Sequence, residues 1–98
     1  MEGKKYVIKT KSRSLHLLEE VKISLLNKEW IIYIKESNQE VPYVVVAFMG
    51  TNKLLNPNKA KITDFLGQKL AYSLKKKIDD SKAYLTSEVQ EIYKNILD

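Results

Sequence analysis

The sequence predicts an α+β protein: a small three-stranded, mostly antiparallel sheet with three helices, in the order β-α-β-β-α-α. Two observations lead to this expectation. Residues 29–49 contain two runs of β-branched, aromatic and aliphatic side chains separated by a polar stretch, which is typical of a buried hairpin. Residues 62–78 instead carry apolar side chains every four positions, which is typical of a helix. With 98 residues, the chain has the length of one domain, expected to span residues 1–98.

The N-terminal part offers one strand and one ambiguous segment. Residues 5–10 are expected to form an edge strand, because lysines flank and interrupt a short β-prone run. Residues 14–27 fit a helix capped by Ser14, with most of their apolar side chains within one half-turn. They also fit a strand, because apolar and polar residues alternate from 21 to 25, and residues 27–29 would then form a hairpin turn. We favour the helix.

The hairpin is expected to supply the other two strands. The second strand of the sheet begins at Trp30, and residues 37–40 turn the chain back. Pro42 has no backbone N–H to donate and should stand at the start of the third strand, Tyr43–Met49. That strand has no internal charge, which favours a central place between the other two. The predicted sheet order is therefore 1-3-2.

The remaining residues predict a basic loop and two helices. Residues 51–61 form the loop, and Thr63 is a good N-cap for a helix that reaches Ile78. A last helix begins at Ser81 or Ser87 and runs to about Leu97, because its apolar side chains recur at spacings of four, three and four.

The sequence contains no recognisable catalytic or metal-binding pattern. The chain has no cysteine and a single histidine, His16, so it offers neither a thiolate nor a recognisable zinc site. Its three glycines form no nucleotide-binding pattern. Glu19 and Glu20 are adjacent, as are Asp79 and Asp80, and neighbouring positions on a helix diverge rather than converge on one atom. We therefore expect no enzyme activity, no cofactor and no metal ion.

The positive charge of the chain is segmental. Residues 1–13, 41–62 and 63–78 together carry twelve Lys or Arg against two acidic residues, whereas the other stretches are mildly acidic. Such clustering is typical of a surface that meets a polyanion. The candidate binding residues are Lys9, Lys11, Arg13, Lys53, Lys59, Lys61, Lys69, Lys75, Lys76 and Lys77. The run at 75–77 also has a purely structural interpretation, since lysines in a last helical turn complement the helix dipole.

These observations favour a small, basic, non-catalytic protein that binds DNA or RNA through phosphate contacts. The alternative is a protein-binding module or inhibitor that docks on an acidic partner or a nucleoprotein complex. Tyr6, Tyr43 and Tyr72 are the candidate exposed stacking platforms, but the spacing of the aromatic residues favours packing in the core. Because both faces of the hairpin are apolar, we also expect a homodimer that pairs its sheet faces or its C-terminal helices. No stretch is long and apolar enough to span a membrane, so we expect a cytoplasmic protein without a membrane partner.

Overall fold

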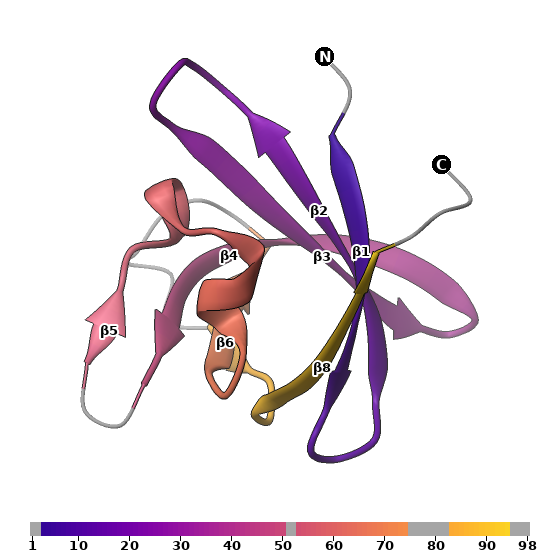
Figure 1. Cartoon of the computed structure of the whole chain (residues 1–98). Helices are drawn as coiled ribbons and strands as arrows, with labels where there is room; N and C mark the ends of the chain where they lie inside the picture. Colours follow the sequence, from indigo (N-terminus) through magenta and orange to yellow (C-terminus); the bar gives the residue numbers. More distant parts are fainter. Residues whose placement is uncertain (1–2, 51–52, 75–82, 95–98) are drawn as a thin grey trace.

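The protein is built from β-strands. The computed structural model describes residues 3–50, 53–74 and 83–94, and these residues contain eight strands and two short 3-10 helices (Figure 1). The strands are β1 Lys4–Thr10, β2 Leu15–Lys22, β3 Lys28–Glu36, β4 Gln39–Met49, β5 Leu54–Leu55, β6 Lys69–Ser73, β7 Tyr84–Leu85 and β8 Val89–Lys94; the 3-10 helices are η1 Pro57–Lys59 and η2 Ile62–Phe65.

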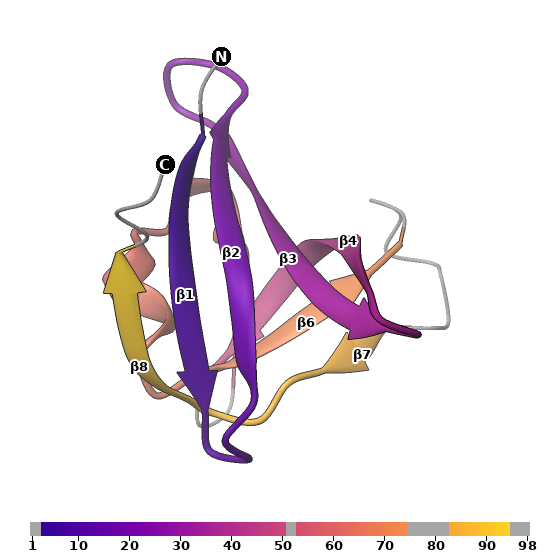
Figure 2. The same ribbon diagram turned by 90° about the vertical axis from the view of Figure 1, so that its right-hand side faces the viewer.

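All strands belong to one antiparallel sheet that curls into a half-barrel (Figures 1 and 2). The order is β7-β6-β4-β3-β2-β1-β8, and β5 adds to β4 off this path. The curl brings the segment before β6 back to β8, where Gly67 N–H donates to the carbonyl of Val89 at 2.7 Å. In return, Val89 N–H donates to the carbonyl of Gln68 at 2.8 Å. These bonds hold the two arms of the sheet around a common interior.

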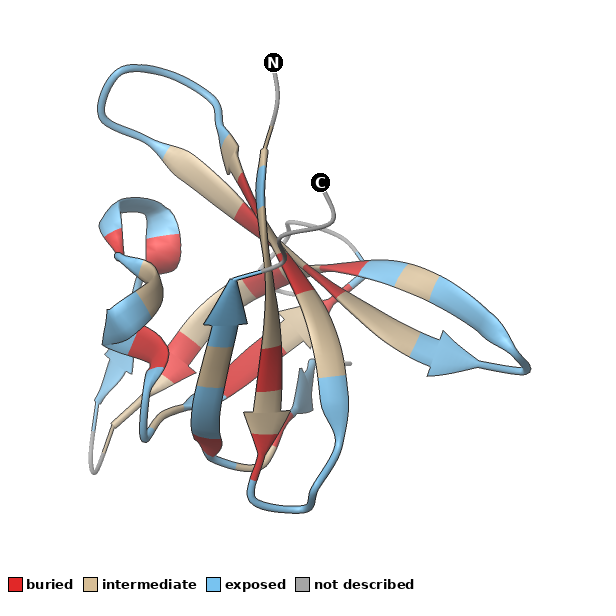
Figure 3. Cartoon of the chain, turned by 45° about the vertical axis from the view of Figure 1, so that its right-hand side comes forward, coloured by how far each residue is buried: buried red, intermediate tan, exposed pale blue. Residues whose placement is uncertain are grey.

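The interior is filled by alternate residues of the strands and by the segment that holds η1 and η2. Trp30 and Phe65 are fully buried, and their rings meet edge to face with centroids 4.8 Å apart. The ring of Phe48 also meets that of Phe65 edge to face, with centroids 5.0 Å apart. Figure 3 shows the buried residues concentrated in the middle of the strands, while the turns are exposed. The core therefore centres on Trp30, whose size makes it the largest of the fully buried side chains.

The predicted α+β class is wrong, and the first error lies in residues 14–27. They form β2 and the turn to β3, so the less favoured strand is correct, but β2 ends at Lys22 and the turn lies at residues 23–27 rather than 27–29. Leu18 is fully buried and its neighbour Leu17 faces the other side of the sheet, which is the two-residue period of a strand. The helical pattern counted Leu25 as a core position, yet this side chain is 99% exposed.

The predicted helix 63–78 is also wrong within the described residues. The chain forms η2, turns at Gly67 with φ +80°, and then enters β6. A spacing of four is a multiple of the strand period of two, so the same pattern fits one face of a strand. Leu70, for example, is fully buried opposite Phe48 of β4. Glycine suits this turn because it adopts a positive φ without strain.

The last helix and the sheet order are corrected as well. Residues 84–85 and 89–94 are strands β7 and β8, while residues 75–82 and 95–98, which include the predicted ends of both C-terminal helices, lie outside the described residues. The first strand is not an edge, because β1 pairs with both β2 and β8. The predicted third strand, residues 43–49, does lie inside the sheet, but the neighbours of β4 are β3 and β6 rather than β1. The missing partner was β6, which falls in the predicted helix 63–78. β4 also begins earlier than predicted, at Gln39, so that Pro42 lies within the strand opposite Tyr33.

Candidate functional site: a cleft where β3 and β4 part

A cleft opens where two neighbouring strands of the sheet separate. The pairing between β3 and β4 runs from Glu36 opposite Gln39 to Ile31 opposite Val44, and it ends there. Before Ile31, β3 pairs only with β2, whereas β4 continues alongside β6 and β5. A bulge between Val45 and Ala47 of β4 bends that strand at this point. The sheet therefore splits, and the split leaves a hollow between the strands.

The cleft is lined by polar and apolar groups from three parts of the chain. Its volume is about 350 Å³, and its lining comprises Ile23, Asn27, Lys28, Glu29, Val44, Val45, Val46, Asn56 and Asn58. A second hollow of about 250 Å³ shares the three asparagines and adds Lys59. The volume of the first hollow falls at the lower end of the range of small-molecule sites, about 300–1,000 Å³. The cleft suits one small planar or polar group rather than a large ligand.

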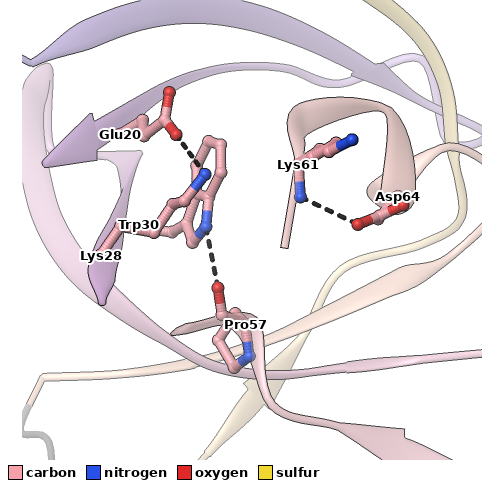
Figure 4. A network of polar contacts seen from close by, with 6 residues as sticks. All are labelled: Glu20, Lys28, Trp30, Pro57, Lys61 and Asp64. Atoms are coloured by element: carbon pink, nitrogen blue, oxygen red, sulfur yellow. Dashed lines mark hydrogen bonds and ion pairs between the residues drawn. The ribbon is translucent and has the colours of Figure 1, made fainter. Parts of the chain in front are cut away.

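The wall of the cleft that carries two of its asparagines is fixed by Trp30. The indole Nε1–H donates to the carbonyl of Pro57 at 3.1 Å, and this contact fastens η1 to the core (Figure 4). The side chain of Asn56 accepts a 2.8 Å hydrogen bond from the backbone N–H of Asn58. Pro57 itself is buried at the first position of η1. The turn is therefore held by the hydrogen bond from Trp30 and by its own Asn58–Asn56 hydrogen bond, although both asparagines are exposed.

On the opposite wall, Lys28 is held by an ion pair. Its Nζ lies 2.6 Å from a carboxylate oxygen of Glu20 and 5.6 Å from the centroid of the Trp30 ring (Figure 4). Charge-assisted hydrogen bonds at this distance are stronger than neutral ones. Tyr6 packs near the same ring, and burial, followed by the charge of Glu20, raises the pKa of its hydroxyl. The ammonium group of Lys28 is thus positioned rather than mobile.

The groups in the cleft can bind but are poor candidates for covalent chemistry. Each carboxamide offers a carbonyl acceptor and an NH₂ donor, and the lysines add cationic donors. A nucleophile paired with a base is missing from this lining. No group of three or more potential metal ligands occurs among the residues that the structure describes. The arrangement fits recognition of a planar group that has both donors and acceptors, next to a negative charge.

The predicted basic residues are distributed over the molecule. Lys59 borders the second hollow, and Lys61 caps η2 with its backbone N–H bonded to Asp64 at 2.8 Å (Figure 4). Lys53 lies just before β5, and Lys69 is in β6 opposite Met49; both are exposed. These four residues belong to the segment 53–69, and of the four only Lys59 lines one of the two hollows. Lys59 is therefore the predicted residue that belongs to the candidate site.

The other predicted residues lie elsewhere. Lys9 is on β1 with its Nζ 3.7 Å from Glu91. Lys11 and Arg13 are in the turn between β1 and β2, at the opposite end of β2 from the cleft. The run 75–77 falls outside the described residues. Within the described chain, the segmental charge therefore does not gather on a single face.

Two of the three tyrosines that were candidate stacking platforms belong to a packed cluster. Tyr43 is buried, with its ring 5.1 Å from that of Tyr72 and 6.2 Å from that of Tyr84. A short hydrogen bond from the Tyr43 hydroxyl to Glu36, together with burial, raises the pKa of Tyr43 to about 12. Tyr6 and Tyr72 are half-buried. These rings pack against one another or against the core, as the favoured interpretation of their spacing expected, and not as open platforms.

Sequence analysis missed the residues that converge on the cleft. The Asn56-Pro57-Asn58 segment lies in the predicted basic loop 51–61, but nothing in the sequence pairs it with Asn27. The strand alternative for residues 14–27 came nearest, because it implied a hairpin turn close to Asn27, although it placed that turn at residues 27–29. The bulge that opens the cleft leaves no mark in the pattern of β4.

Comparison with known protein families, with curated proteins and with solved structures finds no match for this chain. In the part of the chain that the structure describes, no helix has the length and apolar character needed to cross a membrane. The fold and the cleft therefore define the protein only as a β half-barrel with a polar cleft at one end.

Proposed function

We propose that the protein is a non-catalytic nucleic-acid-binding protein that uses the cleft between β3 and β4 and the lysines around it. The observation that carries the proposal is the meeting of three carboxamides, from Asn27, Asn56 and Asn58, with the exposed cation of Lys59. Lys28 and Glu29 also line the cleft, and Glu20 neutralises Lys28. Carboxamides pair with the edges of bases, and lysines contact phosphates. The net positive charge of the chain, +5, supports the same class of ligand, although the basic residues of the described chain do not gather on one face.

The charges near the cleft favour a phosphate backbone. Lys22 and Lys28 stand directly opposite each other at the base of the β2–β3 hairpin, and like charges in this position repel. Glu20 neutralises Lys28, but Lys22 is exposed and makes no ion pair within the described residues. Lys59, on the other side of the cleft, is likewise exposed. Two cations are therefore available to neutralise phosphates.

The direct test is a salt titration of binding to duplex DNA, single-stranded DNA and RNA, followed by fluorescence anisotropy. Each phosphate contact contributes about 0.9 to the slope of log K against log salt for B-form DNA. The double variant Lys22→Gln, Lys59→Gln should bind more weakly and lose about two units of slope if both lysines contact phosphates. Asn58→Ala should weaken binding with little change in that slope, because a carboxamide releases no counterion.

The matched control is Lys35→Gln. Lys35 is also exposed, but it lies near the β3–β4 turn, far along β3 from the cleft, and should leave affinity and slope unchanged. Binding that is absent at low salt, or that does not respond to added salt, contradicts the proposal. Equal losses in the control and in the cleft variants contradict the location of the site.

A second candidate is self-association, which the outer face of the sheet supports. Val7, Leu17 and Tyr33 follow one another across β1, β2 and β3, with Tyr93 and Pro42 at the two ends of the row. Paired charges flank this row on the same face: Lys9 with Glu91, and Lys5 opposite Glu19. Because both signs of charge are present, the face is complementary to a second copy of itself in a twofold arrangement.

The homodimer proposal is tested by light scattering across a tenfold concentration range. A Leu17→Lys variant should shift a dimer to the mass of one chain, and a single-chain mass for the unmodified protein contradicts the proposal. Pairing through a C-terminal helix was wrong as a prediction, because residues 89–94 form a strand. Docking on an acidic protein stays a prediction; the balanced charges of the outer face do not favour it.

A further inference from the structure

The turn between β2 and β3 exposes apolar side chains at the tip of a projecting hairpin. Leu25 is 99% exposed, Leu26 71% and Ile23 53%. Figures 1 and 2 show this hairpin standing away from the body of the half-barrel. The backbone N–H groups of Ile23 and Ser24 both donate to the carbonyl of Asn27, at 3.0 and 3.1 Å, which closes the turn. The leucines are thus held outward by an ordered turn.

A second pair of exposed leucines lies across the cleft. Leu54 is 69% exposed and Leu55 is 42% exposed. Leu55 directly precedes Asn56, and Leu26 directly precedes Asn27, and these two asparagines line the same hollow. In Figure 1 both the hairpin tip and β5 lie on the left side of the molecule. Apolar side chains therefore stand on both sides of a polar, lysine-bordered cleft.

The lysines and asparagines near the turn indicate which type of ligand binds the exposed leucines. An apolar group that projects above lysines fits an anionic surface with an apolar interior, which describes both a lipid bilayer and stacked bases. The cleft beside the tip adds Asn27, Asn56 and Asn58, whose donors and acceptors match base edges better than lipid tails. Apolar side chains that enter a base step unstack it and kink the duplex.

We propose that Leu25 and Leu26 form an apolar wedge that enters a base step of double-stranded DNA and bends it. The inference rests on the nucleic-acid-binding function proposed above. Lys22, next to the turn, contacts a flanking phosphate, and the turn is already ordered before the wedge binds. Because DNA must be unstacked at the step, flexible pyrimidine–purine steps are the preferred points of entry.

The test measures binding and bending together. A short duplex carries a donor dye at one end and an acceptor at the other, and the full chain is added at low salt. The unmodified protein should raise energy transfer between the ends. The double variant Leu25→Ser, Leu26→Ser should abolish this rise and weaken binding about tenfold. Leu15→Ser is the matched control, since Leu15 is 64% exposed at the opposite end of β2 and should change neither quantity.

The outcomes distinguish a failure of the wedge proposal from a failure of the proposed nucleic-acid binding. Salt-sensitive binding without a rise in energy transfer, or a rise that survives in the double variant, overturns the wedge and leaves the proposed function standing. No binding to any nucleic acid overturns both. Binding of the unmodified protein to anionic vesicles of phosphatidylcholine and phosphatidylglycerol, lost in the double variant and without DNA bending, assigns the tip to a bilayer and overturns the wedge. Thermal unfolding checks that each variant is folded.

Discussion

The two turns that border β2 differ in composition and in how they are held. The β1–β2 turn is polar: Lys11 N–H donates to the carbonyl of Glu88 at 2.8 Å, and Ser12 N–H donates to the hydroxyl of Ser87 at 3.1 Å. The β2–β3 turn is apolar and bonded only to itself among the described residues, through the carbonyl of Asn27. The polar turn is therefore tied to the segment that precedes β8, the neighbour of β1, while the apolar turn makes no such bond within the described chain.

The β1–β2 turn follows the usual arrangement, in which turns are polar and apolar side chains are buried. The β2–β3 turn departs from it. Burial of a leucine stabilises a fold by about 1.5–3 kcal/mol relative to exposure, so exposed leucines contribute little to the free energy of folding. The residues that stabilise one end of β2 and the residues that carry the proposed function at the other are thus physically separate. Substitutions should show this separation.

The largest effect is expected at the base of the apolar turn. Trp30→Ala removes the fully buried indole and its hydrogen bond to Pro57, which should lower the free energy of unfolding by about 3–5 kcal/mol. Urea unfolding measures the change. Trp30→Phe, which keeps most of the ring volume, should recover part of the loss. A loss below about 1 kcal/mol in the alanine variant would show that the core does not depend on this residue.

A smaller effect is expected at the polar turn. The double variant Ser12→Ala, Ser87→Ala removes the hydroxyl contacts that join the turn to the segment before β8, and should lower the free energy of unfolding by about 1 kcal/mol. Ser24→Ala in the apolar turn is the control and should change stability by less than about 0.5 kcal/mol. Equal losses in both variants would mean that the two turns are held alike.

His16, near the start of β2, should make the stability of the protein depend on pH. Desolvation lowers the pKa of His16, only partly offset by a backbone hydrogen bond with Tyr33 and the charge of Glu40. The neutral imidazole is therefore favoured in the folded state, and its contribution is fully present above the unfolded pKa of about 6.5. Stability is lost as the pH falls below 6.5 towards the lower, folded value. His16→Gln should remove this part of the pH dependence in thermal unfolding between pH 7 and 5, and a profile unchanged by the substitution argues against it.

The smallest effect on stability is expected at the leucine tip. Leu25→Ser, Leu26→Ser should change the free energy of unfolding by less than about 0.5 kcal/mol, because both side chains already lie in water. Chemical denaturation of this variant beside the unmodified protein provides the measurement. A loss above 1 kcal/mol would show that the leucines pack against the protein in solution, and it would remove the basis for the wedge.

The sequence by itself determined the hairpin of β3 and β4. Its two runs of β-prone residues and the polar turn at 37–40 predict antiparallel strands, because alternation and turn chemistry are local properties. The observed turn is shorter, and its residues Ser37 and Asn38 both adopt positive φ. The internal place of β4 followed from the absence of charge in residues 43–49. These features need no knowledge of distant residues.

Tertiary structure alone decided between helix and strand in the remaining segments. Apolar residues spaced by four fit both periods, and only the hydrogen bonds of β6 to β4 and of β8 to β1 select the strand. The cleft depends on distant contacts even more strongly. Asn27 and Asn56 meet because Trp30 binds Pro57 and because β4 bulges where β3 leaves it. Such convergence is set by packing, which a pattern within one segment does not encode.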